Sequence, residues 1–159
     1  MRVLFVCTGN TCRSPMAEAI FRNLASRHLQ CAEDELRSHG VDSLSAGIAA
    51  GDSFPASPEA IALLRERGID LSQHLSQQLS GEMLSESDLI FVMTDAHRNA
   101  LVSARPDLAG RIQLLRRDGG SVSDPIGGGL ECYLACADQL TTAVQEIVEQ
   151  IFEKDTDTK

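Results

Sequence analysis

Short apolar runs and longer amphipathic segments follow one another along this chain. Continuous apolar runs are typical of strands buried on both faces of a sheet, whereas apolar residues that recur at helical spacing are typical of helices with one buried side. Four segments are expected to be strands: 2–6, 41–47, 88–93 and 111–115. Helices are expected from Pro15 onward and at 57–68, 80–87, 94–104 and 131 to about 153. This alternation predicts a parallel α/β sheet with helices on both faces.

Residues at the ends of these segments support the boundaries. Ser14 is expected to cap the first helix, with Pro15 as its first residue. Gly68 is suited to end the second helix. The glycine-rich segment 118–129 predicts a loop, and the acidic run 31–38 predicts a solvated turn.

Length and composition suit a single globular domain. The chain has 159 residues, of which 43% are hydrophobic and 23% are charged. A chain of this size can bury a substantial core. We expect one domain over 1–153, followed by a tail at 154–159 that frays.

The balance of charge narrows the range of partners. The formal net charge is −9 at pH 7, which argues against a nucleic acid or an anionic membrane as partner. No apolar run approaches the length of a membrane span, and the first residues lack a signal-peptide cleavage signature. The five cysteines are an odd number without the spacing of a disulfide scaffold. A reduced, cytoplasmic protein is therefore expected.

The segment 7–14, CTGNTCRS, joins the first predicted strand to the first predicted helix. Ligands of open parallel sheets bind beyond the carboxyl ends of strands, and backbone amides at a helix N-terminus hold anions. Gly9 and Asn10 tolerate the positive φ angles of a tightly wrapped loop. Arg13 supplies a planar guanidinium that can hold two phosphate oxygens. The same positive potential favours the thiolate form of Cys7, so one loop would hold both an anion and a sulfur nucleophile.

Other interpretations of this loop fit the residues less well. A Cys-x5-Arg pattern on its own arises often by chance, and a free cysteine is commonly just a small buried hydrophobic residue. A zinc site fits poorly, because four residues separate Cys7 from Cys12 and no second ligand pair lies nearby. The strand before the loop and the helix after it favour anion binding.

The segment FVCTGNTCRSPMAEAIF at 5–21 resembles the phosphate-binding loop of the low-molecular-weight protein tyrosine phosphatase family. Four further motifs follow in the family's order and approximate spacing: SAG at 45–47, HLSQQLS at 74–80, VMT at 92–94 and DP at 124–125. The similarity spans nearly the whole chain. It implies a flavodoxin-like, doubly wound, four-stranded parallel sheet, in agreement with the predicted strands.

The resemblance implies a role for each matching residue. Cys7 would be the nucleophile, Arg13 the phosphate clamp and Asp124 the general acid. The loop residues expected to bind substrate are Thr8, Gly9, Asn10, Thr11, Cys12 and Ser14, of which Ser14 would also donate to the Cys7 thiolate. The residues expected to form a supporting hydrogen-bond network are Asn10, Glu18, Ser45 and His74.

In the implied reaction, the Cys7 thiolate attacks the phosphorus of a phosphorylated protein side chain in line and forms a cysteinyl-phosphate intermediate. Asp124 protonates the leaving group and then takes a proton from the water that releases inorganic phosphate. Loop amides and Arg13 bind the equatorial oxygens throughout. The reaction requires no metal and no cofactor.

Two positions depart from the tyrosine-selective members of the family. Thr11 stands where those members carry a bulky aliphatic residue, and Ile126 with glycines stands where they place aromatic residues. Both departures resemble the bacterial protein-arginine phosphatase branch. A threonine hydroxyl can position water or an N–H group, and a cation favours a nearby carboxylate. We therefore expect phosphoarginine as substrate, with phosphotyrosine as the alternative.

Two other classes of protein share this fold. Thioredoxin-coupled arsenate reductases also share the loop, but they use further cysteines in the middle of the chain, and 70–90 contains none. A non-catalytic phosphate- or flavin-binding module would not need Cys7, Arg13 and Asp124 together. Both are weaker alternatives.

The remaining cysteines and histidines are expected to be mainly structural. Cys12 either packs within the loop or forms a reversible disulfide with Cys7 under peroxide. Cys132 and Cys136 lie on one face of the last helix and are expected to pack in the core, with a redox or metal pair as the alternative. The side chains expected to be inert or at the surface are Cys31, His28, His39 and His97.

Overall fold

The computed structural model describes residues 1–153 and contains a four-stranded parallel sheet with the order β2-β1-β3-β4. The strands are β1 (Arg2–Cys7), β2 (Asp42–Gly47), β3 (Leu89–Val92) and β4 (Ile112–Leu114). Each lies within one residue of its predicted bounds at either end. The predicted flavodoxin-like sheet is confirmed. The tail predicted to fray, 154–159, lies outside the described residues.

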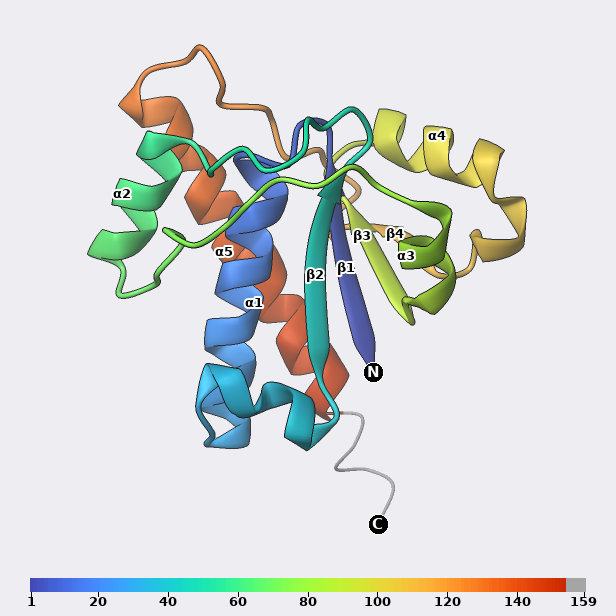
Figure 1. Cartoon of the computed structure of the whole chain (residues 1–159), viewed down its shortest axis with the longest axis horizontal. Helices are drawn as coiled ribbons and strands as arrows, with labels where there is room; N and C mark the ends of the chain where they lie inside the picture. Colours follow the sequence, from blue (N-terminus) through green and yellow to red (C-terminus); the bar gives the residue numbers. More distant parts are fainter. Residues whose placement is uncertain (154–159) are drawn as a thin grey trace.

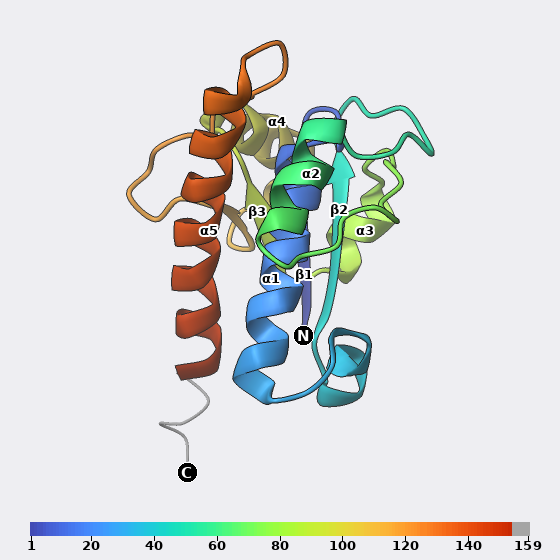
Figure 2. The ribbon, with the colours of Figure 1, turned by 90° about the vertical axis from the view of Figure 1, so that its left-hand side faces the viewer.

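Helices cover both faces of the sheet. The helices on one face are α1 (Arg13–Leu29), α2 (Pro58–Glu66) and α5 (Leu130–Glu153), which Figure 2 shows in the foreground. Those on the other face are α3 (Gly81–Glu86) and α4 (Asp95–Ala104), at the right of Figure 1. Two short 3₁₀ helices, η1 (Glu33–His39) and η2 (Pro106–Leu108), complete the structure. Within residues 1–153, no helix has the length and apolar character needed to cross a membrane.

The apolar run of β1 explains how both layers of helices are held. Side chains alternate between the two faces of a strand. Val3 and Phe5 therefore enter the core shared with α1 and α5, whereas Leu4 and Val6 enter the core shared with α3 and α4. All four side chains are fully buried. The continuous apolar run is thus explained by a central strand that is buried on both faces.

The structure corrects two local predictions. Helix α1 begins at Arg13, with Cys12 rather than Ser14 at its N-cap position. The Ser14 hydroxyl is buried against the loop instead of capping the helix. The acidic run at 31–38 is mostly exposed, as predicted, but it forms the 3₁₀ helix η1 rather than a simple turn and buries Leu36 against the core. In contrast, the helix predicted at 57–68 is capped by its first residue, Ser57, because the Ser57 hydroxyl accepts a hydrogen bond from the Ala60 N–H.

The strand order fixes where a ligand can bind. From β1 the chain runs through α1 to β2 on one side of β1, and the next strand, β3, lies on its other side. Loops therefore diverge at the carboxyl end of β1, which is the usual ligand site of such sheets. Cys7 is the last residue of β1 and therefore lies at this point. Figure 1 shows the carboxyl end of β1 at the top of the sheet.

Candidate active site

The loop that follows β1 wraps around the Cys7 sulfur. Ser14 Oγ lies 2.9 Å from Cys7 Sγ, and the Asn10 N–H donates to the sulfur at 3.3 Å. Cys7 is buried, at 2% exposure. Both contacts can stabilise negative charge on the sulfur, and the N-terminus of α1 adds its dipole in the same direction. Such an arrangement can support a sulfur nucleophile within an anion-binding loop.

Asn10 holds the loop in shape. Its backbone has a φ of 55°, so the predicted positive φ is found at Asn10, whereas the prediction for Gly9 is wrong. The fully buried side chain donates from Nδ2 to Ser14 Oγ at 2.8 Å and to Ser45 Oγ at 3.0 Å. Its Oδ1 accepts from the Gln77 N–H at 3.0 Å. Asparagine tolerates this backbone conformation and here also satisfies its polar atoms.

The predicted supporting residues form a second layer behind Asn10. Ser45 is 1% exposed, and Glu18 makes side-chain hydrogen bonds with Ser45 and Ser43. Burial raises the pKa of Glu18, and these hydrogen bonds oppose that effect. His74 Nε2 donates to the Asn10 carbonyl at 2.7 Å, while burial lowers the pKa of His74. Asn10 is thus held at both its side chain and its backbone carbonyl.

Arg13 and Asp124 meet at the loop, although 111 positions separate them in the chain. Arg13 is 5% exposed, and it donates to the Val122 carbonyl at 3.1 Å and to Asp124 Oδ2 at 3.4 Å. Asp124 Oδ1 accepts from the Ile126 N–H at 3.1 Å, while its side chain stays 44% exposed. The segment before α5 therefore brings a solvent-accessible carboxylate next to the arginine of the loop.

The segment 48–57 supports the outer side of the loop. The Ala49 N–H donates to the Thr8 carbonyl, and the Ser57 N–H donates to the Thr11 carbonyl, at 2.9 and 2.8 Å. Thr8 is exposed and Thr11 is partly exposed. Both predicted substrate-binding threonines therefore lie where a ligand can reach them, with their backbone positions fixed.

The set of buried cysteines differs from the one predicted. Cys12 is buried and shares a thiol hydrogen bond with Cys136. The expectation of core packing is confirmed for Cys136, at 3% exposure, and is wrong for Cys132, which is exposed. Cys132 lies in the first turn of α5, where its neighbour Tyr133, and not Cys132, is buried in the core. Cys31 is partly exposed, and all five cysteines are free.

His97 is the site residue that the sequence prediction missed. It was expected at the surface, but it is 8% exposed and its Nε2 lies 2.8 Å from Thr8 Oγ1. Leu101, one helical turn further along α4, is also buried. That spacing is the sequence signal that could have placed His97 on the buried side of α4. His28 and His39 are exposed, as predicted.

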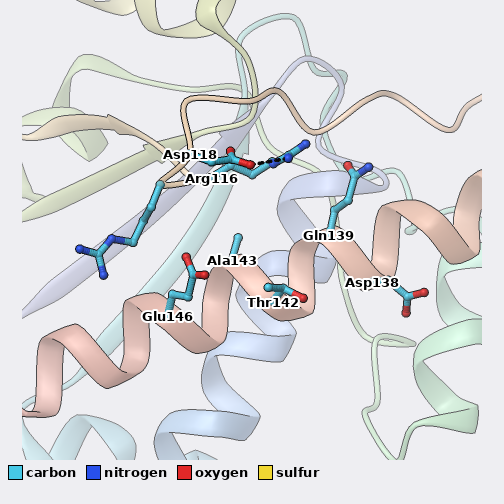
Figure 3. A pocket seen from close by; sticks show the side chains of 8 residues that line it. Arg116, Asp118, Asp138, Gln139, Thr142, Ala143 and Glu146 are labelled. Atoms are coloured by element: carbon cyan, nitrogen blue, oxygen red, sulfur yellow. Dashed lines mark hydrogen bonds and ion pairs between the residues drawn. The ribbon is translucent and has the colours of Figure 1, made fainter.

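One groove lies away from this loop. It measures about 690 Å³ and runs between segment 116–118 and α5 (Figure 3). Its charges are partly paired, since Arg116 donates to Asp118 at 2.6 Å. None of the predicted site residues lines it. Across residues 1–153, no three His, Cys, Asp or Glu side chains gather where they could hold a metal ion.

Comparison with known proteins identifies the family. The model of the low molecular weight phosphotyrosine protein phosphatases matches residues 2–157. A protein-arginine-phosphatase of Bacillus subtilis (strain 168) is 34% identical over 95% of this chain and 97% of its own length. A probable low molecular weight protein-tyrosine-phosphatase EpsP of Ralstonia nicotianae is 33% identical over 94% of each chain.

Solved structures agree with this sequence match. The YwlE arginine phosphatase from Geobacillus stearothermophilus superposes with a TM-score of 0.86 at 33% identity, covering 99% of this chain and 97% of that one. A low molecular weight protein tyrosine phosphatase from T. tengcongensis gives 0.82 at 41% identity, covering 94% and 99%. The chain therefore belongs to the low molecular weight phosphotyrosine protein phosphatase family and is a cysteine-based, metal-independent phosphatase.

Proposed function

We propose that this phosphatase hydrolyses phosphoarginine in proteins through a cysteinyl-phosphate intermediate on Cys7. The observation that carries the proposal is the loop wrapped around the buried Cys7 sulfur, with Arg13 and Asp124 in contact beside it. A YwlE arginine phosphatase with serine in place of the corresponding cysteine has been solved with a phosphorylated active-site serine. That relative supports a covalent phosphoryl intermediate at the same position of this chain.

Each residue has a defined task in the proposed reaction. The Cys7 thiolate attacks phosphorus, and the amides of Thr8 to Ser14 bind the three equatorial oxygens. Arg13 turns from the Val122 carbonyl and Asp124 toward the phosphoryl group, where a bidentate contact is stronger. Asp124 is then free to protonate the leaving nitrogen and later to take a proton from the attacking water. This chemistry needs a reduced Cys7, so we place the protein in the cytoplasm.

Three features of the loop surroundings support phosphoarginine. Thr11 has a hydroxyl group where an aliphatic residue would have none. A hydroxyl group in this loop can form a hydrogen bond with a water molecule or an N–H group of the substrate. Tyr133 is turned into the core at 5% exposure, where it makes a side-chain hydrogen bond with Ser57. The tyrosine at the start of α5 is therefore not available as a flat wall for a phenyl ring. Ile126, after the Asp-Pro pair, is 58% exposed and aliphatic.

One observation favours phosphotyrosine as the second candidate. Phe54 is 59% exposed and belongs to segment 48–57, whose backbone is bonded to the loop. An exposed aromatic ring on such a segment can stack on a phenyl group. The relative from T. tengcongensis, 41% identical, is described as a tyrosine phosphatase.

Paired assays separate the two substrates. Wild type and Thr11→Ile are each measured on peptides that carry phosphoarginine or phosphotyrosine in the same sequence. We expect wild type to prefer phosphoarginine and Thr11→Ile to shift the ratio of kcat/KM toward phosphotyrosine by about 10-fold or more. Thr142→Ile, an exposed threonine on α5, is the matched control and should leave the ratio unchanged. A wild type that prefers phosphotyrosine contradicts the phosphoarginine assignment. An unchanged ratio of kcat/KM values in Thr11→Ile would show that Thr11 does not determine the substrate preference.

A second variant tests the nucleophile itself. Cys7→Ser should have no measurable turnover on either peptide, while it still binds inorganic phosphate. Full turnover in Cys7→Ser contradicts the proposed function as a whole, whichever peptide is used.

A further inference from the structure

His97 reaches the phosphate-binding loop from the opposite layer of the fold. It lies in the first turn of α4, where its N–H donates to the N-cap hydroxyl of Thr94 at 3.2 Å. Its ring is 8% exposed and ends with Nε2 at 2.8 Å from Thr8 Oγ1. Thr8 directly follows Cys7. A buried side chain from one layer thus contacts the first residue of the loop after the sulfur.

The hydrogen-bond inventory of the ring indicates its protonation. Nδ1 is buried and has no hydrogen-bond partner among residues 1–153. Buried N–H groups without a partner are rarer than buried acceptors without one, so the hydrogen belongs on Nε2. Burial and the nearby positive charge of Arg13 lower the pKa of His97, with Asp124 acting in the opposite direction. Neutral His97 therefore donates from Nε2 to Thr8 Oγ1.

This contact completes the fixation of Thr8. The Thr8 carbonyl already accepts a hydrogen bond from the Ala49 N–H at 2.9 Å. With its side chain held by His97, Thr8 is anchored at both its backbone and its hydroxyl group. The peptide between Cys7 and Thr8 carries the first N–H group of the loop, and its carbonyl accepts from the Ile48 N–H at 2.9 Å. The His97 contact adds a hold on the Thr8 side chain next to that peptide.

We propose that His97 is a positioning residue for phosphoryl transfer, which holds Thr8 and thereby aligns the start of the loop with the Cys7 sulfur. The inference rests on the proposed role of Cys7 as nucleophile. His97 makes no contact with the phosphoryl group in this scheme. It acts through Thr8, and its loss should affect the transition state more than substrate binding, because small errors of alignment reduce rate strongly.

Three substitutions at His97 separate a hydrogen bond from simple packing. The Gln side chain can place its amide nitrogen near the position of Nε2, the Asn side chain is too short to do so, and Leu has no donor. We expect His97→Leu and His97→Asn to lose about 10-fold in kcat and in kcat/KM alike, which marks an interaction expressed in the transition state. His97→Gln should stay within about 3-fold of wild type, which is the rescue that a packing role would not give.

A double-mutant cycle with Thr8 tests the connection. Thr8→Val should reproduce the loss of His97→Leu, and the combined variant should be no slower than either single variant. Thr8→Ser keeps the hydroxyl group and should therefore lose less activity than Thr8→Val. Because Thr8 is exposed, the Val and Ser variants decide the question even if His97→Leu does not fold, which thermal unfolding of each variant will show.

The outcomes are distinct. Equal losses in all three His97 variants, or losses of His97→Leu and Thr8→Val that multiply, overturn the inference. An inactive Cys7→Ser together with wild-type rates in every His97 variant overturns only the role of His97. Retained turnover in Cys7→Ser contradicts the proposed function instead.

Discussion

The Ser14 hydroxyl lies 2.9 Å from the Cys7 sulfur, and neither side chain is open to solvent. Asn10 Nδ2 donates to the same Ser14 oxygen at 2.8 Å. With that oxygen already accepting from Asn10, its own hydrogen is left to point at the sulfur, since the other acceptor in reach, the Ala46 carbonyl, is at 3.5 Å. Asn10 in this way gives the Ser14 hydrogen bond its direction.

Removal of the Ser14 hydroxyl should slow the chemical step. Hydrogen bonds to charged groups contribute about 1.5–3 kcal/mol, so we expect Ser14→Ala to lower kcat by about 10- to 100-fold. Ser26→Ala is the matched control, because Ser26 is also a buried serine of α1 but bonds to the Asn23 carbonyl, away from the loop. Steady-state kinetics of both variants test this. A kcat for Ser14→Ala equal to that of Ser26→Ala would show that the hydrogen bond between Ser14 and Cys7 does not contribute to catalysis.

Asn10 combines a left-handed backbone with three side-chain hydrogen bonds. Asn10→Gly and Asn10→Ala lose the same hydrogen bonds, but only the alanine is strained at φ 55°. We expect Asn10→Ala to be less stable than Asn10→Gly by about 1 kcal/mol in urea unfolding, with both variants strongly reduced in activity.

Gln30 supplies the control for this comparison. It has a φ of 53° at the exposed C-cap of α1, far from the loop. Gln30→Ala and Gln30→Gly should show the same difference in stability with no loss of activity. Equal stability of the two Asn10 variants would mean that the loop relaxes when Asn10 is replaced.

Cys12 is expected to protect Cys7 from irreversible oxidation. Peroxide converts the Cys7 thiolate to a sulfenic acid, and the Cys12 thiol can displace its oxygen as water to form a disulfide. The thiol hydrogen bond with Cys136, together with burial, raises the pKa of Cys12, which makes this step slow. Dithiothreitol should restore activity to wild type but not to Cys12→Ser after the same peroxide treatment, and Cys136→Ala should recover more fully than wild type.

Cys31→Ser is the control for general oxidation, since Cys31 is partly exposed and remote from Cys7 in the chain. It should recover as wild type does. Wild-type protein that stays inactive in dithiothreitol would contradict a protective Cys7–Cys12 disulfide.

Acid should destabilise the fold through its two buried histidines. Burial lowers the pKa of His74 and of His97 in the folded state below the ordinary value of 6.5. On acidification through that value, the unfolded chain takes up protons that the folded chain does not, so the free energy of unfolding falls. We expect lower stability at about pH 5.5 than at about pH 7.5, and a smaller fall in His74→Gln than in wild type.

His39→Gln serves as the comparison, because His39 is exposed. Urea unfolding at the two pH values should give it the same fall as wild type. If the free energy of unfolding of His74→Gln fell as much as that of wild type, His74 would not be a cause of the acid sensitivity. Glu18 contributes in the opposite sense at lower pH, because burial raises its pKa above the usual 4.5, but it is common to all three proteins.

The sequence predicted the strands and the loop well because both depend on local pattern. A strand buried on two faces needs a continuous apolar run, and β1 supplies one. The loop needs Cys7, Asn10 and Arg13 within one short segment, and spacing alone shows this. The contact between Arg13 and Asp124 spans 111 positions and was predicted only through resemblance to the family.

Two errors have a common physical cause, which is that a tertiary contact overrode a local preference. Ser14 has the side chain of a helix cap, but Asn10 and Cys7 occupy its hydroxyl group. His97 is flanked by polar residues, but α4 presses it against Thr8. The partners of these side chains, Asn10, Cys7 and Thr8, lie outside both helices, so no pattern within α1 or α4 alone could reveal these hydrogen bonds.

A rapid denaturing quench of wild-type protein during turnover, followed by mass spectrometry of its peptides, tests the role of Cys7 most directly. We expect one phosphoryl group on Cys7 in wild type and the same modification in Asp124→Ala at a lower overall turnover, because Asp124 assists both formation and hydrolysis of the intermediate. Turnover without a phosphorylated Cys7, or a phosphoryl group on a different residue, would contradict the cysteinyl-phosphate mechanism.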